Sequence, residues 1–413
     1  MLQLPDTEKP FWREAYPASV YPELTEDISV DVAVVGAGIT GLTSAYLLKQ
    51  AGYTVAVLEK DTVGAGTTGR TTGKVTSQHE LNYYDLGNRL GQETARVYAA
   101  ANNAAVEQVA SIIEKEQIEC DWQRDDNYIF TDDGKKVGTL TQEAKVAADL
   151  GLPATLESDS PLPFKTKVAL RFANQGKFHA QKYLSGLAEA VNGDGSFVFE
   201  NSKAAGFKDG VPARVKTEKA SVAADHVIIA SHIPTFPLLA RGSYALLEYP
   251  TESFAIAGKI DSSLDGMYIS PDKNHHSIQP IKVNGENMLL IVGAGGNIPG
   301  LGGSRKARFR ELADYGEKWL GMTTITHCWS DMDYIAYDEV PLIGKLYPWS
   351  RRLYTATGFK KWGLSGGTAA AMILSDVISG KENPWASTFD STRFRPITSI
   401  PRRVIRHIKN KFQ

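Results

Sequence analysis

The stretch VDVAVVGAGITG, residues 30–41, decides the fold of this chain. Its first half, Val30–Val35, is apolar except for Asp31, which is typical of a parallel strand buried on both faces. Its second half spaces three glycines as GxGxxG, and apolar residues then recur at helical spacing until Gly52. Because a second apolar run, Thr54–Leu58, follows, the sequence predicts a strand–helix–strand unit with a tight turn after the first strand.

The three glycines of this turn serve separate physical purposes. Gly36 allows the tight turn, Gly38 lets the backbone approach a pyrophosphate, and Gly41 lets the helix pack close to the strand. The first N–H groups of the helix, from Ile39 and Thr40, point with the helix dipole toward such phosphates. The turn therefore predicts a dinucleotide site.

An acidic residue completes the same unit. Glu59 ends the second strand about 20 residues after the turn, where a carboxylate binds ribose hydroxyls and repels a 2′-phosphate. This position argues against NADP. Lys60 follows directly and is expected to contact the same cofactor.

A second glycine-rich segment distinguishes FAD from NAD. Residues 357–368 read TGFKKWGLSGGT and open a helix far along the chain. Small residues at a helix N-terminus suit the electron-rich N1–C2=O edge of a flavin, whereas a nicotinamide enzyme needs no second anchor. Gly358, Trp362, Gly363 and Ser365 are therefore expected at the flavin, and the predicted cofactor is FAD.

Length and composition limit the remaining classes. The chain has 413 residues, which is too long for one compact core, and its net charge of −2 gives no indication of nucleic-acid binding. Cys120 and Cys328 lie far apart in the sequence, so a disulfide framework or a metal site is not expected. The sequence shows no signal-peptide pattern at its start and no apolar run of about 18 residues. A cytoplasmic enzyme is the expectation.

The order of predicted elements indicates an α/β fold with two interleaved domains. A Rossmann-like FAD-binding domain is expected to comprise residues 28–115, 166–235 and 327–390, with one long helix from residue 88 to about 115. A substrate domain with a mixed or antiparallel sheet is expected to comprise residues 116–165 and 236–326. Residues 391–413 form a basic amphipathic tail. It is interpreted as packing on the body, docking a partner or contacting an anionic membrane.

Several stretches resemble the D-amino-acid-oxidase-like superfamily, which includes glycine oxidase and sarcosine oxidase. They cover nearly the whole chain in order: residues 31–41 with Glu59, then 67–76, 177–191, 226–231, 338–344 and 356–380. Residues 70–79, RTTGKVTSQH, and residues 358–363, GFKKWG, further resemble bacterial members fused to a C-terminal Rieske domain. The paired Cys-x-His and Cys-x-x-His ligands of that domain do not occur in this sequence.

The resemblance implies roles by position. It places the segment Arg70, Thr71, Thr72 and Gly73 along the flavin and pyrophosphate, Ala204 at the adenine, Ala230 and Ser231 along the dinucleotide, and Trp362 and Gly363 at the isoalloxazine edge. In sarcosine-oxidase-like members a cysteine near the position of Cys328 bonds covalently to the flavin. The spacing to Asp338 is longer here, so the FAD is expected to be non-covalent.

Candidates for the reaction site flank these motifs. Lys74, Lys361 and Trp362 are interpreted as catalytic, and Tyr244, Tyr249 and His276 as substrate-binding, although core packing or loop exposure is the commoner outcome for such residues. The arginine with which this family often holds a substrate carboxylate is not identifiable, and Gln279 lies near its expected place. A simple amino-acid substrate is therefore doubtful.

The expected function is oxidation of a C–H bond next to nitrogen in a small molecule. Hydride passes to flavin N5, and the imine product hydrolyses in water. Two alternatives stay open: an electron-transfer flavoprotein that works with a separate iron–sulfur partner, and a hydroxy-acid dehydrogenase.

Overall fold

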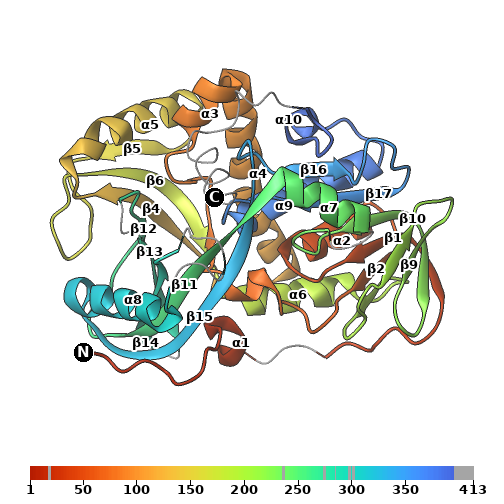
Figure 1. Ribbon diagram of the computed structural model, residues 1–413, viewed down its shortest axis with the longest axis horizontal. Coiled ribbons are helices and arrows are strands. Elements are labelled where there is room, and N and C mark those ends of the chain that lie inside the picture. The colour runs from red at the N-terminus through yellow and green to blue at the C-terminus, as the bar shows by residue number, and fades with distance from the viewer. Residues whose placement is uncertain are drawn as a thin grey trace.

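The computed structural model describes residues 1–16, 20–234, 238–272, 276–283, 285–295, 299 and 303–394, with the backbone alone for residues 238–241. These residues form two β-sheets that lie beside each other, each with its own helices (Figure 1). The prediction of an α/β fold with a mixed second sheet is confirmed.

The first sheet contains the predicted strand–helix–strand unit. Its strand order is β16 (Leu342–Lys345), β17 (Leu353–Thr357), β10 (Ser221–Ile229), β1 (Ile28–Val35), β2 (Val55–Leu58) and β7 (Phe197–Phe199), and β9 (Ala213–Lys216) with β8 (Gly206–Lys208) extends from β10. The strands from β17 to β7 are parallel. Val32 and Val34 face one hydrophobic cluster while Ala33 and Val35 face another, so β1 is buried on both faces. Its one charged residue, Asp31, accepts hydrogen bonds from the N–H and hydroxyl of Thr54.

Helices of the first domain pack closely on one another. They are α1 (Phe11–Ala15), α2 (Ile39–Gln50), the 3-10 turn η1 (Thr67–Arg70), α4 (Gln92–Glu116), α6 (Ala180–Val191), α7 (Leu238–Leu247), α9 (Gly363–Ile378) and α10 (Ala386–Phe389). A Cβ atom on Gly367 would lie only 2.5 Å from Thr40 Oγ1. Glycine at 367 therefore lets α9 pack closely against the first turn of α2.

The second sheet is largely antiparallel. Its order is β15 (Met322–Ala336), β11 (Glu248–Ile260), β14 (Glu286–Gly293), β13 (His276–Val283), β12 (Met267–Ile269), β4 (Gln123–Thr131), β6 (Val168–Lys177) and β3 (Lys74–Val75), and β5 (Ala154–Glu157) pairs with β6. Figure 1 shows β11 and β15 as two long ribbons that cross the middle of the molecule between the two domains. Helix α8 (Arg305–Leu320) packs on β11, β14 and β15, and α3 (Tyr83–Leu90), η2 (Gly134–Lys136) and α5 (Val137–Asp149) lie at the other end of the sheet.

Three expectations differ from the structure. The helix expected from residue 88 is two helices, α3 and α4, because Gly91 has a φ of +91° and interrupts the helical backbone. Strand β6 was expected in the FAD-binding segment 166–235, but it pairs with β4 and β5 of the second sheet. Strand β15 crosses the expected boundary between residues 326 and 327, because it pairs with β11 along its whole length.

Most of the C-terminal tail, residues 395–413, lies outside the described residues. Arg393, counted with that tail, is held on the body, where it pairs with Asp338 at 2.9 Å and donates to the carbonyl of Pro341. No helix of the described residues is long and apolar enough to cross a membrane.

Candidate active site

The turn after β1 is rich in glycine, so its backbone is largely free of side chains. Gly36 has a φ of +109°, and a Cβ atom there would lie 2.6 Å from the carbonyl oxygen of Ala230, which brings Ala230 and Ser231 beside the turn. A Cβ atom on Gly41 would lie 1.9 Å from the carbonyl oxygen of Gly36, so the helix can approach this closely only with glycine at 41. The N-cap residue of α2 is Gly38, which has no side chain, and the first turn carries no acidic residue. The Ile39 N–H donates to the Thr68 hydroxyl at 3.1 Å, so the side-chain partner at this helix end is neutral. This helix end therefore suits a phosphate group.

Glu59 lies beside this turn and is nearly buried. Its carboxylate accepts hydrogen bonds from the N–H groups of Ala37 at 2.8 Å and Asp61 at 3.1 Å, while burial raises its pKa above the usual value. The N–H of Ser202 donates to the Glu59 carbonyl, so the segment that leads to Ala204 lies next to it. Lys60 is exposed, with its ammonium group 3.5 Å from Asp61.

The segment Arg70–Gly73 is fixed at the boundary of the two domains. The indole N–H of Trp12 donates to the carbonyl of Thr71 at 2.6 Å, and that of Trp329 donates to the carbonyl of Arg70 at 3.0 Å. Gly73 has a φ of +85°, and a Cβ atom there would lie 2.6 Å from the carbonyl of Phe178. These contacts hold the backbone without using the side chains of Thr71 and Thr72.

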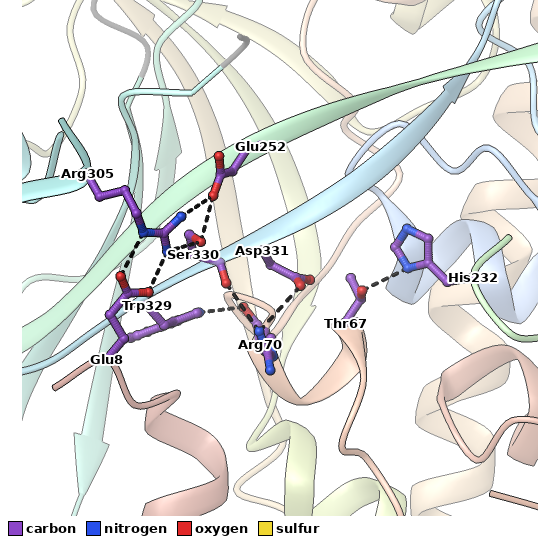
Figure 2. Close-up of polar contacts among 9 residues, drawn as sticks. All are labelled: Glu8, Thr67, Arg70, His232, Glu252, Arg305, Trp329, Ser330 and Asp331. Carbon is purple, nitrogen blue, oxygen red and sulfur yellow. Dashed lines mark hydrogen bonds and ion pairs between the residues drawn. The ribbon is translucent and has the colours of Figure 1, made fainter. Parts of the chain in front are cut away.

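Side chains on β15 alternate between its two faces (Figure 2). Ser330 points toward Arg305, whose guanidinium group also pairs with Glu8 and Glu252 at 2.6 Å each. Trp329 and Asp331 point the other way, toward Arg70, and Asp331 lies 3.9 Å from its guanidinium group. The face of β15 that carries the odd-numbered residues is thus the face toward the first domain.

The loop that precedes α9 has an unusual backbone. Gly358, Lys360 and Lys361 all have positive φ angles of 77°, 52° and 70°. Asp333 on β15 accepts a hydrogen bond from the N–H of Lys361, and the Tyr334 carbonyl accepts one from the N–H of Lys360. Left-handed backbone at two lysines costs energy and is typical of functional loops that their surroundings hold in place.

A cavity of about 280 Å³ lies where the two domains meet. Thr71, Thr72 and Trp362 line it from the first domain, together with Leu364 at the start of α9. Ser253, Ser277 and Val292 of the second sheet line the opposite wall. Its volume is close to the lower end of the range for small-molecule sites, which is about 300–1,000 Å³.

Lys74 is buried in the wall of this cavity. Its Nζ donates to the carbonyl of Tyr268 at 2.7 Å and to the hydroxyl of Ser277 at 2.8 Å. No carboxylate of the described residues forms an ion pair with it. Burial, with a smaller contribution from the positive charge of Lys177, lowers the pKa of Lys74 to about 7.

Trp362 is positioned by a buried histidine. The His79 ring stacks on the Trp362 ring with centroids 4.7 Å apart and planes 12° apart. Its Nδ1 lies 2.7 Å from the Tyr98 hydroxyl, and its Nε2 lies 2.9 Å from the Ser365 hydroxyl. Burial lowers the pKa of His79 to about 3, so the ring is neutral at ordinary pH. Two of the predicted residues, Trp362 and Ser365, are thus linked through one histidine.

Tyr244, Tyr249 and His276, expected to bind substrate, do not line the described part of this cavity. The Tyr244 hydroxyl donates to the carbonyl of Leu346, and its ring packs in the hydrophobic cluster of the first sheet. Tyr249 stacks on Tyr337 further along β11 than the cavity. His276 stacks on Tyr315 of α8 with centroids 3.7 Å apart, so it points to the sheet face opposite that of Ser277. The sequence could not show this because the side on which a strand residue lies depends on its register.

Two cavity residues, Ser253 and Ser277, were not identified from the sequence. Each is a small polar residue in a strand that mixes polar and apolar residues, and that local pattern is too common to indicate a ligand. Glu80, which has a φ of 57°, also lines the cavity and was missed. Positive φ at a non-glycine residue is visible only in the backbone, so no sequence signal marked Glu80.

One family of known proteins matches most of this chain. The profile of the family described as FAD dependent oxidoreductase (DAO) matches residues 31–377. The chain belongs to this family of FAD-dependent oxidoreductases.

Two related proteins and one solved structure are similar to large parts of this chain. A protein of Bacillus subtilis (strain 168), named putative Rieske 2Fe-2S iron-sulfur protein YhfW, is 34% identical over 387 residues, or 93% of this chain and 75% of that protein. The gamma-glutamylputrescine oxidoreductase of Escherichia coli (strain K12) is 29% identical over 218 residues, or 51% of each chain. The glycine oxidase structure from Geobacillus kaustophilus has the same fold, with a TM-score of 0.70 and 21% identity over 89% of this chain and 100% of that one.

Proposed function

We propose that this oxidoreductase acts on a small amine or amino acid and removes hydride from a carbon next to nitrogen. When bound, FAD accepts that hydride at N5, and the imine product hydrolyses in water. The observation that carries the proposal is the cavity between the two domains. Its first wall comes from the segments expected to hold the flavin, and its second wall presents the hydroxyl groups of Ser253 and Ser277.

The residues around the turn fit an FAD molecule. The open start of α2, from Gly36 to Gly41, would hold the pyrophosphate with Arg70, Thr71, Thr72 and Gly73 beside it, and Ala230 and Ser231 would follow the dinucleotide. Glu59, Lys60 and Ala204 would contact the adenosine half. The start of α9 would meet the flavin at Gly358, Trp362, Gly363 and Ser365, where a Cβ atom on Gly363 would meet open space.

Non-covalent attachment is part of the proposal. Cys328 is buried and lies on the face of β15 that packs in the cluster with α8, rather than on the face of Trp329 and Asp331. Burial also raises the pKa of its thiol to about 11, which keeps it a poor nucleophile. Acid precipitation should therefore release the yellow colour, and colour retained in the pellet would contradict this.

Two observations bear on the substrate: one favours an amine, and the other disfavours a carboxylate anchor. The E. coli relative named gamma-glutamylputrescine oxidoreductase shares 29% identity over half of this chain. No arginine lines the described part of the cavity, so a carboxylate has no bidentate partner there. Lys361 and Trp362 border the site of reaction, and Lys74 lies within it.

A second candidate function is electron transfer to a separate iron–sulfur protein. The observation in its favour is the 34% identity with the B. subtilis protein named as a Rieske protein, a quarter of which lies outside the match. In this case small amines would reduce the flavin poorly, and a reduced flavin would pass electrons rapidly to a Rieske protein. Docking of a partner or a membrane through the basic tail stays a prediction.

Anaerobic mixing of the FAD-loaded protein with amines, amino acids and hydroxy acids tests the proposal. Flavin bleaching by an amine, with one equivalent of carbonyl product, is the expected result. Bleaching by hydroxy acids alone would overturn the amine assignment. Failure of every compound, with rapid electron transfer to an iron–sulfur protein after dithionite reduction, would favour the second candidate.

A further inference from the structure

A neutral amine can make both hydrogen bonds of Lys74. A charged lysine carries three N–H donors and no acceptor, whereas a neutral one has two N–H donors and a lone pair. The two acceptors within reach, the Tyr268 carbonyl and the Ser277 hydroxyl, take two donors at 2.7 and 2.8 Å. Both partners are uncharged, so neither stabilises an ammonium ion, and the neutral form of Nζ keeps a lone pair that can accept a proton.

The charged groups around Lys74 also favour the neutral form. Lys177 pairs with Lys74 across β3 and β6, and its ammonium group already binds Asp125 at 2.5 Å. Tyr268 contributes its carbonyl from β12, while Glu80 and Lys361 lie on the lining of the same cavity and His79 is neutral. Burial and the charge of Lys177 thus oppose a positive charge on Lys74, and the carboxylate of Asp125 is engaged by Lys177.

An amine can lose hydride from its neighbouring carbon only when its nitrogen lone pair is free. Most alkyl amines arrive as ammonium ions, because their pKa resembles that of lysine, at about 10.4. We propose that Lys74, oriented by Ser277, is the base that removes this proton from the substrate ammonium group inside the cavity. The inference rests on the proposed function and names the substrate form that this site accepts, a protonated aliphatic amine.

The step balances in atoms and charge. The N–H bond of the substrate breaks, and its proton forms a bond with the lone pair of Lys74 Nζ. Substrate becomes a neutral amine and Lys74 becomes an ammonium ion. The carbon–hydrogen bonding pair then leaves as hydride to the bound FAD, the oxidant, and the proton on Lys74 returns to water after the product departs.

The pH dependence of anaerobic flavin reduction at limiting amine tests this role. In the wild type the second-order rate constant should rise through a pKa near that of Lys74, about 7, because Lys74 must be neutral. In Lys74→Met this rise (the acidic limb of the pH profile) should move toward the pKa of the free amine. The rate at about pH 7.5 should then fall roughly 10²-fold, the usual size of a general-base effect, and recover in part near pH 10.

The pH profiles of matched variants distinguish a proton-transfer role of Lys74 from a packing role. Lys74→Arg keeps a cation that cannot deprotonate, so its profile should follow Lys74→Met rather than the wild type. Ser277→Ala should keep the limb with a shifted midpoint. Lys165→Met, which changes an exposed lysine on the loop before β6, should leave the profile unchanged. An unshifted limb in both Lys74 variants would overturn the inference, even if amines reduce the flavin as proposed.

A titration without substrate gives a second readout. The absorbance spectrum of the FAD-loaded protein should change with one midpoint near pH 7 in the wild type and lose this transition in Lys74→Met. Absence of the transition from the wild type would contradict a titrating Lys74 in the cavity. If no amine reduces the flavin, the proposed function fails and the base role fails with it. A transition that Lys74→Met removes would then show only that Lys74 titrates.

Discussion

The turn after β1 and the cavity wall formed by β3 and β13 offer a ligand different groups. The turn offers backbone atoms, whereas the wall offers side chains. The turn Gly36–Gly41 offers N–H groups, with Cβ atoms excluded at Gly36 and Gly41 by contacts of 2.6 and 1.9 Å. The opposite wall offers the amine of Lys74 and the hydroxyl of Ser277, brought together by pairing of β3 with β6 and β12 with β13. In the proposed function, the first region would recognise phosphate by shape and dipole, and the second would act on a ligand through titratable chemistry.

This difference determines how each region should respond to mutation. Backbone recognition tolerates no added atom, and the N–H groups that it uses do not titrate. Side-chain recognition tolerates changes of shape but depends on protonation and on the second shell that orients each group. Three further predictions test this contrast, in order of decreasing effect.

The largest effect is expected at the turn. In Gly38→Val a branched side chain would occupy the space for the pyrophosphate, and its Cβ would lie 3.1 Å from Thr68 Oγ1. FAD content should fall at least about 100-fold, equivalent to ~2.7 kcal/mol, at every pH. Flavin absorbance of the purified protein measures this, with Gly138→Ala as control because a Cβ there meets no atom within 4 Å. A yellow Gly38→Val protein would mean that the turn does not hold the dinucleotide.

Glu248, at the boundary of the two regions, should make stability depend on pH. Thr357 has one hydroxyl proton for two acceptors, the His232 carbonyl at 2.5 Å and Glu248 at 3.1 Å, so a protonated Glu248 that donates to Thr357 satisfies both. Burial raises the pKa of Glu248 to about 8. The stability from this proton is fully present below the unfolded pKa of about 4.3 and is lost as pH rises through 8.

Urea unfolding of the wild type between about pH 5 and pH 9 measures this loss, which is at most about 1.4 kcal/mol for each pH unit. Glutamine is neutral throughout this pH range, so Glu248→Gln should remove the pH-dependent part of the free energy of unfolding. Glu114→Gln changes an exposed residue and should retain that pH dependence. Equal pH dependence of wild type and Glu248→Gln would show that Glu248 does not titrate in this range.

The smallest effect is expected at Trp362, where indole and flavin should meet. Trp362→Ala should alter flavin absorbance and fluorescence, because the indole lines the cavity where the flavin is expected. Trp349→Ala is the control, since Trp349 is 68% exposed. Spectra and turnover that match the wild type would assign Trp362 to packing alone.

The sequence alone predicted the first region well, for a physical reason. The turn, the strand before it, the helix after it and Glu59 are local, and glycine has few other reasons to occur at that spacing. The family resemblance, confirmed by the match over residues 31–377, also follows from these local motifs and their order. Boundaries were less certain: Gly91 divided a predicted helix, and β6 joined a sheet to which it was not assigned.

The second region depended on tertiary structure. Lys74 was a candidate because it flanks a flavin motif, yet its neutral partners come from strands about 200 residues away in the sequence, with 203 residues separating it from Ser277. Conversely, His276 was predicted beside the substrate, but it lies one residue from Ser277 and so faces α8. Composition and spacing identify a strand, whereas register alone decides which of its side chains enter the cavity, and register is fixed only when distant strands pair.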